Sequence, residues 1–338
     1  MPTRRDFLRQ VAQAGGACAL SGVLPGLAGA ASNGSATTLP ALTSRPSSGL
    51  IPTTLKSVVA DIRAREIVAD TVIHETLLRE VMDEGVRIAV PGAASASEAW
   101  NRILKPDDVV GIKFNRIGQD SINTTAPFAA QLVESLKAAD ISPRRVMLIE
   151  APDRLTRELK TRPCPTGYSG PKVSFSSGED ELAALLQEVT AIVNVPFLKT
   201  HNVAEMTGCL KNLSHALIRR PRLCHKNGCA PFVGDILALP QIRPLLRLHI
   251  VNALRAVFDG GPLPSPETTW THSGVLVGTD PVAVDAVGTD ILNEVRLKRK
   301  LPAIGDRDGR IAHVHAAAAR GLGTDDQDYI TVVRPRMF

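Results

Sequence analysis

Apolar residues along the chain alternate between runs that suit helices and runs that suit strands. Within residues 75–84, Leu78, Val81 and Met82 share one helical face, which predicts an amphipathic helix. The short β-branched run 109–114 predicts a buried strand. By the same criteria we expect helices at 95–104, from Pro127 onward, and at 179–189, 204–218, 281–294 and 311–319. Further strands are expected at 146–149, 191–195, 248–257, 274–277 and 330–333.

This alternation favours an α/β fold built on a mostly parallel, helix-covered sheet with Rossmann-like layering. We expect one large domain over residues 51–338, and a division of that domain into two lobes is left open. In such sheets the reactive residues usually lie just past the carboxyl ends of the strands. The candidate site residues are therefore those that follow the predicted strands.

The first thirty residues do not fit this pattern and resemble an export signal. Arg4 and Arg5 precede a polar residue, Phe7 and Leu8, as in the twin-arginine consensus, and an uncharged Ala/Gly/Leu-rich stretch follows. The small residues that end at Ala30 form a cleavage site. We expect residues 1–30 to be a twin-arginine signal peptide that the twin-arginine translocase recognises, which places the mature protein in the periplasm. The alternative is a basic N-terminus before a short amphipathic helix.

Residues 31–50 are rich in Ser, Thr, Pro, Ala and Gly and nearly uncharged, which predicts a disordered linker. Removal of residues 1–30 takes away three arginines and one aspartate, so the net charge falls from +5 to +3. The mature chain has no Lys/Arg run and few aromatic residues, so we expect no nucleic-acid partner. No other segment is apolar and long enough for us to expect a membrane span after cleavage.

Polar residues gather where three predicted strands end. Lys113 and Asn115 close the first strand, and Glu150 closes the second. Lys199 and His201 follow the third, and their side chains point the same way if this segment is extended. Each has a simpler interpretation, because a lysine at a strand end is usually a solvated charge.

The next predicted helix carries Lys211, Asn212 and His215, although a histidine on a polar helix face is commonly solvated or structural. Thr124 and Thr125 precede Pro127 at a helix start, where free backbone N–H groups favour anions. Together with the cationic groups at the strand ends, these residues would suit a carboxylate or a phosphate. We therefore predict a small anionic ligand.

Three aspartates complete the candidate set. Asp259 and Asp280 each follow a predicted strand, and Asp285 lies within the helix that Pro281 begins. Together with Glu150, Asp259 and Asp285 would position the lysines or bind a metal. Asp280 has a competing interpretation as an ordinary helix cap, because Pro281 suits the first helical position.

Cys224, His225 and Cys229 occur within six residues. The mature chain has four cysteines, an even number that allows disulfides in an exported protein. A disulfide between Cys224 and Cys229, two free thiols, and a metal site with His225 all remain open. The spacing fits no familiar zinc or iron–sulfur pattern, so the cofactor stays unknown, with a metal ion as one candidate. His225 is also placed to reach the Lys199 and His201 crevice.

Three segments resemble a bacterial and archaeal family of unknown function numbered 362. They are 108–115 with the downstream 124–127, 194–201 continuing to 210–213, and 279–286. The resemblance spans about residues 55–325 and implies one α/β domain with an unassigned activity. Some relatives carry a ferredoxin-like iron–sulfur segment, whose closely spaced cysteines are lacking here. Members often have Asp where this chain has Asn252. The Lys-Thr-His and Lys-Asn segments also distantly resemble nickel-dependent lactate racemase-like proteins.

Two classes of function remain. In an enzyme, Lys113, Lys199 and Lys211 would hold an anionic substrate or cofactor while His201 transfers a proton. In a binding or cofactor-delivery protein, the same crevice would carry an anionic ligand to a periplasmic partner without chemistry. Familiar hydrolase, P-loop and zinc-protease motifs do not occur in the sequence.

Overall fold

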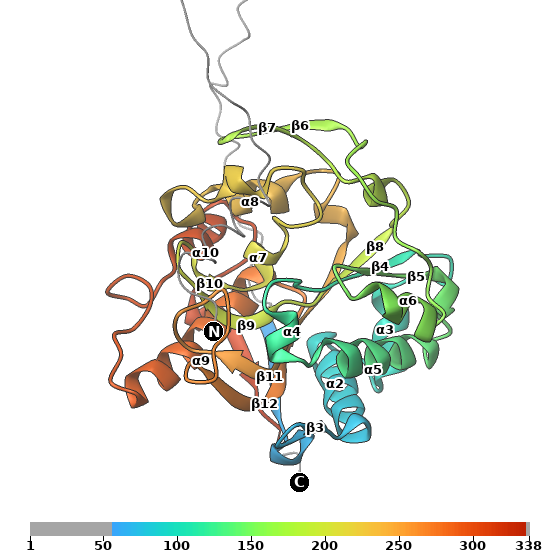
Figure 1. Ribbon diagram of the computed structural model, residues 1–338, viewed down its shortest axis with the longest axis horizontal. Helices are drawn as coiled ribbons and strands as arrows, with labels where there is room; N and C mark the ends of the chain where they lie inside the picture. Colours follow the sequence, from blue (N-terminus) through green and yellow to red (C-terminus); the bar gives the residue numbers. More distant parts are fainter. Residues whose placement is uncertain (1–55, 336–338) are drawn as a thin grey trace, which may run out of the picture. The chain divides into compact units, whose positions relative to one another are not determined.

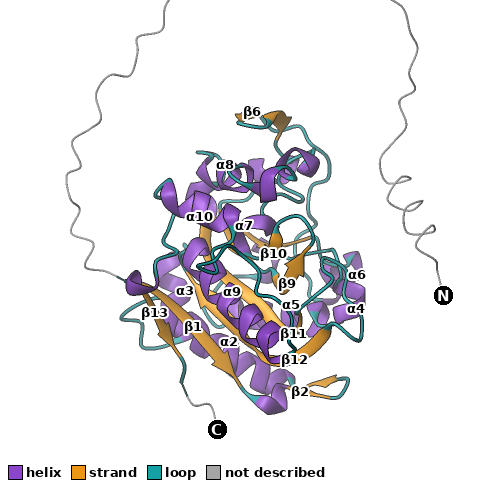
Figure 2. Ribbon diagram, turned by 90° about the vertical axis from the view of Figure 1, so that its left-hand side faces the viewer, coloured by secondary structure: helices purple, strands orange, loops and turns teal. Residues whose placement is uncertain are grey.

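A mixed nine-stranded sheet with helices on both faces organises residues 56–335, the part of the chain that the computed structural model describes. The strand order is β13-β1-β12-β11-β8-β4-β5, and β9 branches from β11 and pairs with β10 (Figure 1 and Figure 2). The pairs β13–β1, β11–β8, β11–β9, β8–β4 and β4–β5 are parallel. The predicted α/β class with a mostly parallel, helix-covered sheet is confirmed.

The sheet strands are β1 (Ser57–Arg63), β4 (Val110–Lys113), β5 (Val146–Ile149), β8 (Ala191–Asn194), β9 (Phe197–His201), β10 (Glu205–Thr207), β11 (Leu246–Val257), β12 (Thr269–Gly278) and β13 (Ile330–Val333). Two small hairpins pair β2 (Val68–Ala69) with β3 (Val72–Ile73), and β6 (Lys172–Phe175) with β7 (Gly178–Glu181). The α-helices are α2 (Glu75–Ala89), α3 (Ala96–Ile103), α4 (Gln119–Ile122), α5 (Thr125–Lys137), α6 (Asp153–Glu158), α7 (Cys209–Asn212), α8 (Phe232–Ala238), α9 (Pro281–Lys298) and α10 (Ala312–Ala319).

Alternation along the central strands creates two hydrophobic cores. In β1, Val59 faces one core while Ala60 and Ile62 face the other. Helices α2, α3 and α5 pack on one face, and α7, α8, α9 and α10 pack on the other (Figure 1). The β6–β7 hairpin lies at the periphery of the domain (Figure 2). The described residues belong to one compact unit, without a division into two lobes.

Two of the helix predictions are wrong. Residues 179–189 form β7 and a single 3-10 turn, Ala184–Gln187, because this segment pairs with β6 at the edge of the domain. Residues 204–218 form β10 and the four-residue helix α7, followed by turns. The apolar residues of this segment are buried as expected, but they are buried along an irregular path through the core.

The predicted signal peptide (1–30) and linker (31–50) lie outside the described residues. Within residues 56–335, no helix combines the length and the apolar character that a membrane crossing requires.

Candidate functional site

The carboxyl ends of β4, β5 and β8 meet at one edge of the sheet and bring four predicted polar residues together. The Lys113 Nζ donates to Glu150 Oε2 at 2.7 Å and also lies 3.3 Å from Asn212 Oδ1. Asn115 Nδ2 donates to the same Asn212 oxygen at 2.9 Å. Asn212 in turn donates to Asn194, at the end of β8, at 2.8 Å. Convergence at strand ends therefore links β4, β5, β8 and α7 in one hydrogen-bonded network.

Lys199 and Lys211 lie beside this network without a carboxylate partner among the described residues. The side chain of Lys199, on β9, is fully buried and donates to the backbone carbonyls of Ile117 and Pro262. Lys211, on α7, is 2% exposed and donates to Ser214 Oγ at 3.1 Å. Only Lys113 of the three buried lysines forms an ion pair within the described part of the chain.

Burial changes the charge of these lysines. It lowers the pKa of Lys199 to about 7, and the neighbouring Lys211 lowers that pKa further. Burial also lowers the pKa of Lys211 and Lys113, although Glu150 opposes the shift at Lys113. The predicted cationic crevice is thus a group of buried amines whose protonation depends on what lies next to them.

Three histidines lie together beside the lysines. The ring centroids of His201 and His225 are 5.7 Å apart, and those of His215 and His225 are 6.3 Å apart. Burial, reinforced by the charge of Lys211, lowers the pKa of His201 and of His215 to about 3 and lowers that of His225. All three rings are therefore neutral near pH 7. We call His201, His215, His225, Lys199 and Lys211 the lysine–histidine cluster.

Hydrogen bonds at Nδ1 fix which nitrogen of each neutral ring carries the proton. His201 Nδ1 accepts from the backbone N–H groups of Val203 and Ala204, so the proton sits on its Nε2. His225 Nδ1 lies 3.0 Å from the Pro221 carbonyl, which only accepts, so its Nε2 has the free lone pair.

His215 has the same arrangement as His225. Its Nδ1 lies 3.2 Å from Ser214 Oγ, whose own proton is donated to the Lys211 carbonyl. We assign the hydroxyl proton to the shorter bond, 2.8 Å to the carbonyl, so the serine oxygen accepts from His215 Nδ1 and His215 Nε2 keeps a lone pair. The cluster thus offers one Nε2 donor and two Nε2 acceptors.

Asp285 positions the short helix that carries Lys211 and Asn212. It is buried in α9 and accepts hydrogen bonds from the backbone N–H groups of Cys209 and Leu210, the first residues of α7. Burial raises its pKa to about 7. A Cβ on Gly208 would lie 2.1 Å from Asp285 Oδ1, so only glycine permits this contact. Asp285 therefore has a positioning role.

Other predicted ligand-binding residues have structural partners. Asp280 caps α9 by accepting from Val282 N and Ala283 N, and it also accepts from Ser57 Oγ and Thr324 N, so the helix-cap interpretation holds. Asp259 pairs with Arg296 at 2.7 Å. A carboxylate that already has such partners has little capacity left for a substrate.

Thr124 and Thr125 begin α5, as predicted, but no hydrogen bond joins either side chain to the lysine–histidine cluster. Thr124 Oγ1 accepts from Asn252 Nδ2 at 3.0 Å. Two buried oxygens, Thr125 Oγ1 and Asn115 Oδ1, have no hydrogen-bond partner among the described residues. An anion role for this helix start stays a prediction.

The four described cysteines are free thiols, so a disulfide between Cys224 and Cys229 is not formed. Both sulfurs are buried in the core beside α8 and α10. Residues 56–335 contain no group of three or more His, Cys, Asp or Glu side chains arranged to hold a metal ion. The suggested metal set of Cys224, His225 and Cys229 therefore has no geometric support, whereas His225 does reach His201 as predicted.

A cavity of about 750 Å³, which no sequence pattern indicated, lies next to the cluster. It lies past the ends of β4 and β5, and its wall includes Arg116, Glu150, Arg157, Tyr168 and His215. Arg116 directly follows Asn115, so its position after a strand was a usable signal. Arg157 and Tyr168 come from a helix and a loop that no sequence pattern connects to the strand ends.

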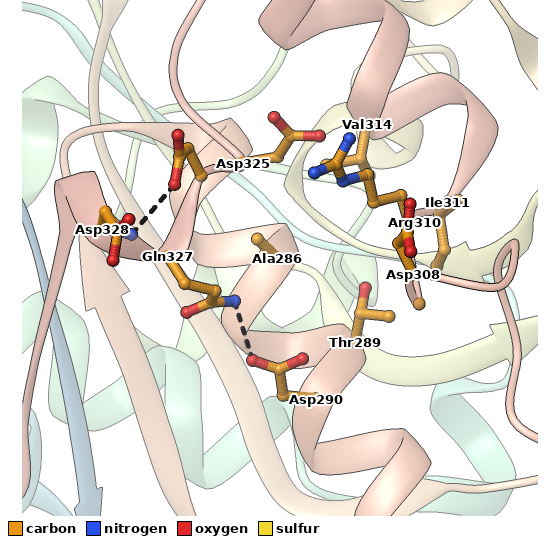
Figure 3. Close-up of a pocket in the computed structure, with 12 residues that line it drawn as sticks. Ala286, Thr289, Asp290, Asp308, Arg310, Ile311, Val314, Asp325, Gln327 and Asp328 are labelled. Atoms are coloured by element: carbon orange, nitrogen blue, oxygen red, sulfur yellow. Dashed lines mark hydrogen bonds between the residues drawn. The ribbon is translucent and has the colours of Figure 1, made fainter.

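A second pocket, of about 290 Å³, is lined by acidic residues near α9 and α10 (Figure 3). Asp290 accepts from Gln327 there, and Asp308 and Asp328 also line the pocket. None of the predicted site residues lines this pocket.

Residues 165–290 match the model of a family described as a domain of unknown function, DUF362. The predicted resemblance is confirmed over this segment, which contains all five residues of the lysine–histidine cluster as well as Asn212 and Asp285. No curated protein matches the chain.

One solved structure that the chain matches is the lactate racemase apoprotein from Thermoanaerobacterium thermosaccharolyticum. It is 12% identical, with a TM-score of 0.35, and the match covers 72% of the present chain and 58% of the racemase chain. The matched region thus spans less than two thirds of that protein. A likeness at this level supports no activity or ligand for the present chain.

Proposed function

We propose that the protein is an enzyme that binds a small organic anion, a carboxylate or a phosphate, at the lysine–histidine cluster and transfers a proton there. The observation that carries this proposal is the burial of Lys199 and Lys211 without a carboxylate partner within residues 56–335. A buried ammonium group is strongly disfavoured unless an anion compensates it. A bound anion would supply that compensation, and both lysines would then be protonated.

The histidines provide the chemistry in this proposal. His201 and His215 are half-buried, so a ligand can reach them while the lysines lie behind. His215 Nε2 has a lone pair that can take a proton, and His201 Nε2–H can give one. A bound anion would oppose the effect of Lys211 and raise the histidine pKa values toward neutrality, where proton transfer is efficient.

A non-catalytic anion-binding or cofactor-delivery protein is the second candidate. One observation favours it: at a pKa of about 3, His201 and His215 are weak bases in the ligand-free chain. A binding protein needs the buried lysines but not the histidines. Replacement of a histidine should therefore reduce the reaction rate of an enzyme, whereas it should leave the ligand affinity of a binding protein unchanged.

The test is incubation of the chain in D2O with pooled small carboxylates and phosphate esters, followed by proton NMR. The enzyme replaces a substrate hydrogen with deuterium or forms a new product. His201→Gln should lower that rate by roughly 10²–10⁴-fold. His315→Gln is the matched control, because His315 is an exposed residue of α10 that pairs with Asp325. Binding without exchange or turnover in any pool would support the second candidate.

We also propose that the mature protein acts in the periplasm after twin-arginine export. The support is the ordered combination of Arg4, Arg5, Phe7 and Leu8, an uncharged stretch and a cleavage site at Ala30. This route carries folded proteins, and the buried polar network of the site would then form before export.

A further inference from the structure

The cavity past the ends of β4 and β5, which we call the β5 cavity, lies where α/β sheets usually bind ligands. Its walls come from the end of β5, helix α6, the loop 163–168 and the turns after α7. A volume of about 750 Å³ lies within the range of pockets for organic ligands and is far larger than an inorganic anion needs.

Two residues belong both to the β5 cavity and to the groups described above. Glu150 lines the cavity and pairs with the buried Lys113 at 2.7 Å. His215 lines the cavity and belongs to the lysine–histidine cluster, with its ring 6.3 Å from that of His225. A ligand in the cavity would therefore contact the reactive groups from the solvent side.

The cavity also has two arginines with free guanidinium groups. Arg116 and Arg157 line it, and the guanidinium group of neither one forms a hydrogen bond or ion pair with another residue in the range 56–335. By contrast, Arg154 on the same helix as Arg157 pairs with Glu158. The acids of the wall are Asp153 and Glu150, and Lys113 neutralises Glu150. The two arginines and two acids of the wall balance formally, and Lys113 behind Glu150 brings the charge of the wall and its ion pair to +1.

Two residues of the cavity wall have a strained backbone, which agrees with a binding role. Glu150 and Ala216 both adopt left-handed conformations, with φ of 60° and 61°, which cost free energy in residues other than glycine. Such conformations persist where the surrounding structure requires them.

The cavity wall also contains a thiol, that of Cys164. It is a poor nucleophile, because burial raises its pKa to about 11.

We propose that the β5 cavity is the substrate pocket of the enzyme, in which Arg116 and Arg157 bind a carboxylate or phosphate group of an extended organic anion at the end that lies away from the lysine–histidine cluster. The other end of that anion lies against Glu150 and His215. Arginine is suited to this because its planar guanidinium binds such oxyanions through two parallel hydrogen bonds. The role of the bound molecule as a substrate rests on the proposed function, whereas its binding by the arginines does not.

The experiment is calorimetric titration of the full chain with citrate, phenyl phosphate and inorganic phosphate. Citrate and phenyl phosphate separate the carboxylate source from the phosphate source. We expect at least one of these two to bind, and Arg116→Gln and Arg157→Gln each to weaken that binding by about tenfold. Arg154→Gln is the matched control on α6 and should change it less than twofold. Thr166→Trp, at an exposed position of the cavity wall, should block binding without unfolding the chain.

The inference is overturned if neither organic anion binds, or if the two arginine variants and Thr166→Trp bind as tightly as the wild type. It is also overturned if inorganic phosphate binds as tightly as phenyl phosphate. The proposed function fails separately. If the arginine variants weaken binding but Lys199→Met and Lys211→Met leave binding and deuterium exchange unchanged, the pocket stands and the proton-transfer site does not.

Discussion

The charge of a buried lysine depends on its neighbours as well as on pH. Lys113 has Glu150 beside it, whereas Lys199 and Lys211 have only neutral oxygen atoms within hydrogen-bonding distance among the described residues. Burial therefore lowers the pKa of Lys199 to about 7, so its protonation changes near neutral pH. This coupling between charge and surroundings also affects folding stability.

We predict that Lys199→Met alters the pH dependence of unfolding. In the unfolded chain Lys199 keeps its proton up to about pH 10.5, whereas in the folded chain it loses it near pH 7. Between these values the unfolded state binds more protons, so this group makes the wild type more stable as pH rises, by at most roughly 1.4 kcal/mol per pH unit. Lys199→Met lacks that contribution.

Urea unfolding at pH 6.5 and 9.5 measures the effect. The wild-type free energy of unfolding should rise relative to that of Lys199→Met between the two values. Lys105→Met, at an exposed position, is the control and should follow the wild type. Parallel pH profiles for the wild type and Lys199→Met would contradict this account.

At the scale of elements, local signals predicted α9 and the strands β4 and β5 well. Asp280 and Pro281 start α9 through neighbouring residues, and β4 and β5 are short apolar runs buried on both faces. The segment 204–218 was misassigned because α7 ends after four residues and is capped by Asp285, which lies far along the sequence. The apolar residues of this segment are spaced so that they reach the core, but the backbone between them does not form one long helix.

Part of the candidate site could likewise be predicted from local sequence, and part of it could not. Lys113, Lys199 and His201 were predictable because they lie at or just after the ends of the apolar runs in the sequence. The β5 cavity was not, since its walls come from segments that meet only after the sheet forms. Strand β1 was missed for a related reason, because its partners β12 and β13 lie at the other end of the chain.

We predict that Gly208→Ala disrupts α7. The added Cβ would lie 2.1 Å from Asp285 Oδ1, so the carboxylate must move and the first N–H groups of α7 lose their acceptor. The loss should be about 2–4 kcal/mol, and anion binding should weaken because Lys211 shifts. Gly321→Ala is the control, because its Cβ meets nothing within 4 Å and only its φ of +70° costs about 1 kcal/mol. Denaturant unfolding that ranks Gly321→Ala as the more damaging change would refute this assignment.

At the scale of the whole molecule, export would require the chain to fold before it crosses the membrane. We predict that Arg4→Lys with Arg5→Lys retains the protein in the cytoplasm, because the translocase reads the arginine pair. Cell fractionation of a bacterial host with and without a working twin-arginine translocase measures this. Arg9→Lys is the matched control and should still be exported. Equal periplasmic amounts of the double variant and the wild type would exclude this route.

The four free cysteines within residues 56–335 would meet an oxidising environment in the periplasm, so their reactivity matters there. Burial raises the pKa of Cys164 to about 11 and of Cys224 to about 12, and it also raises those of Cys209 and Cys229. With a pKa of 11, only about one thiol in 10⁴ is a thiolate at neutral pH, and the thiolate is the form that attacks disulfides. Burial and the raised pKa values therefore slow the reaction of these thiols with disulfides, which would favour reduced cysteines in an oxidising environment.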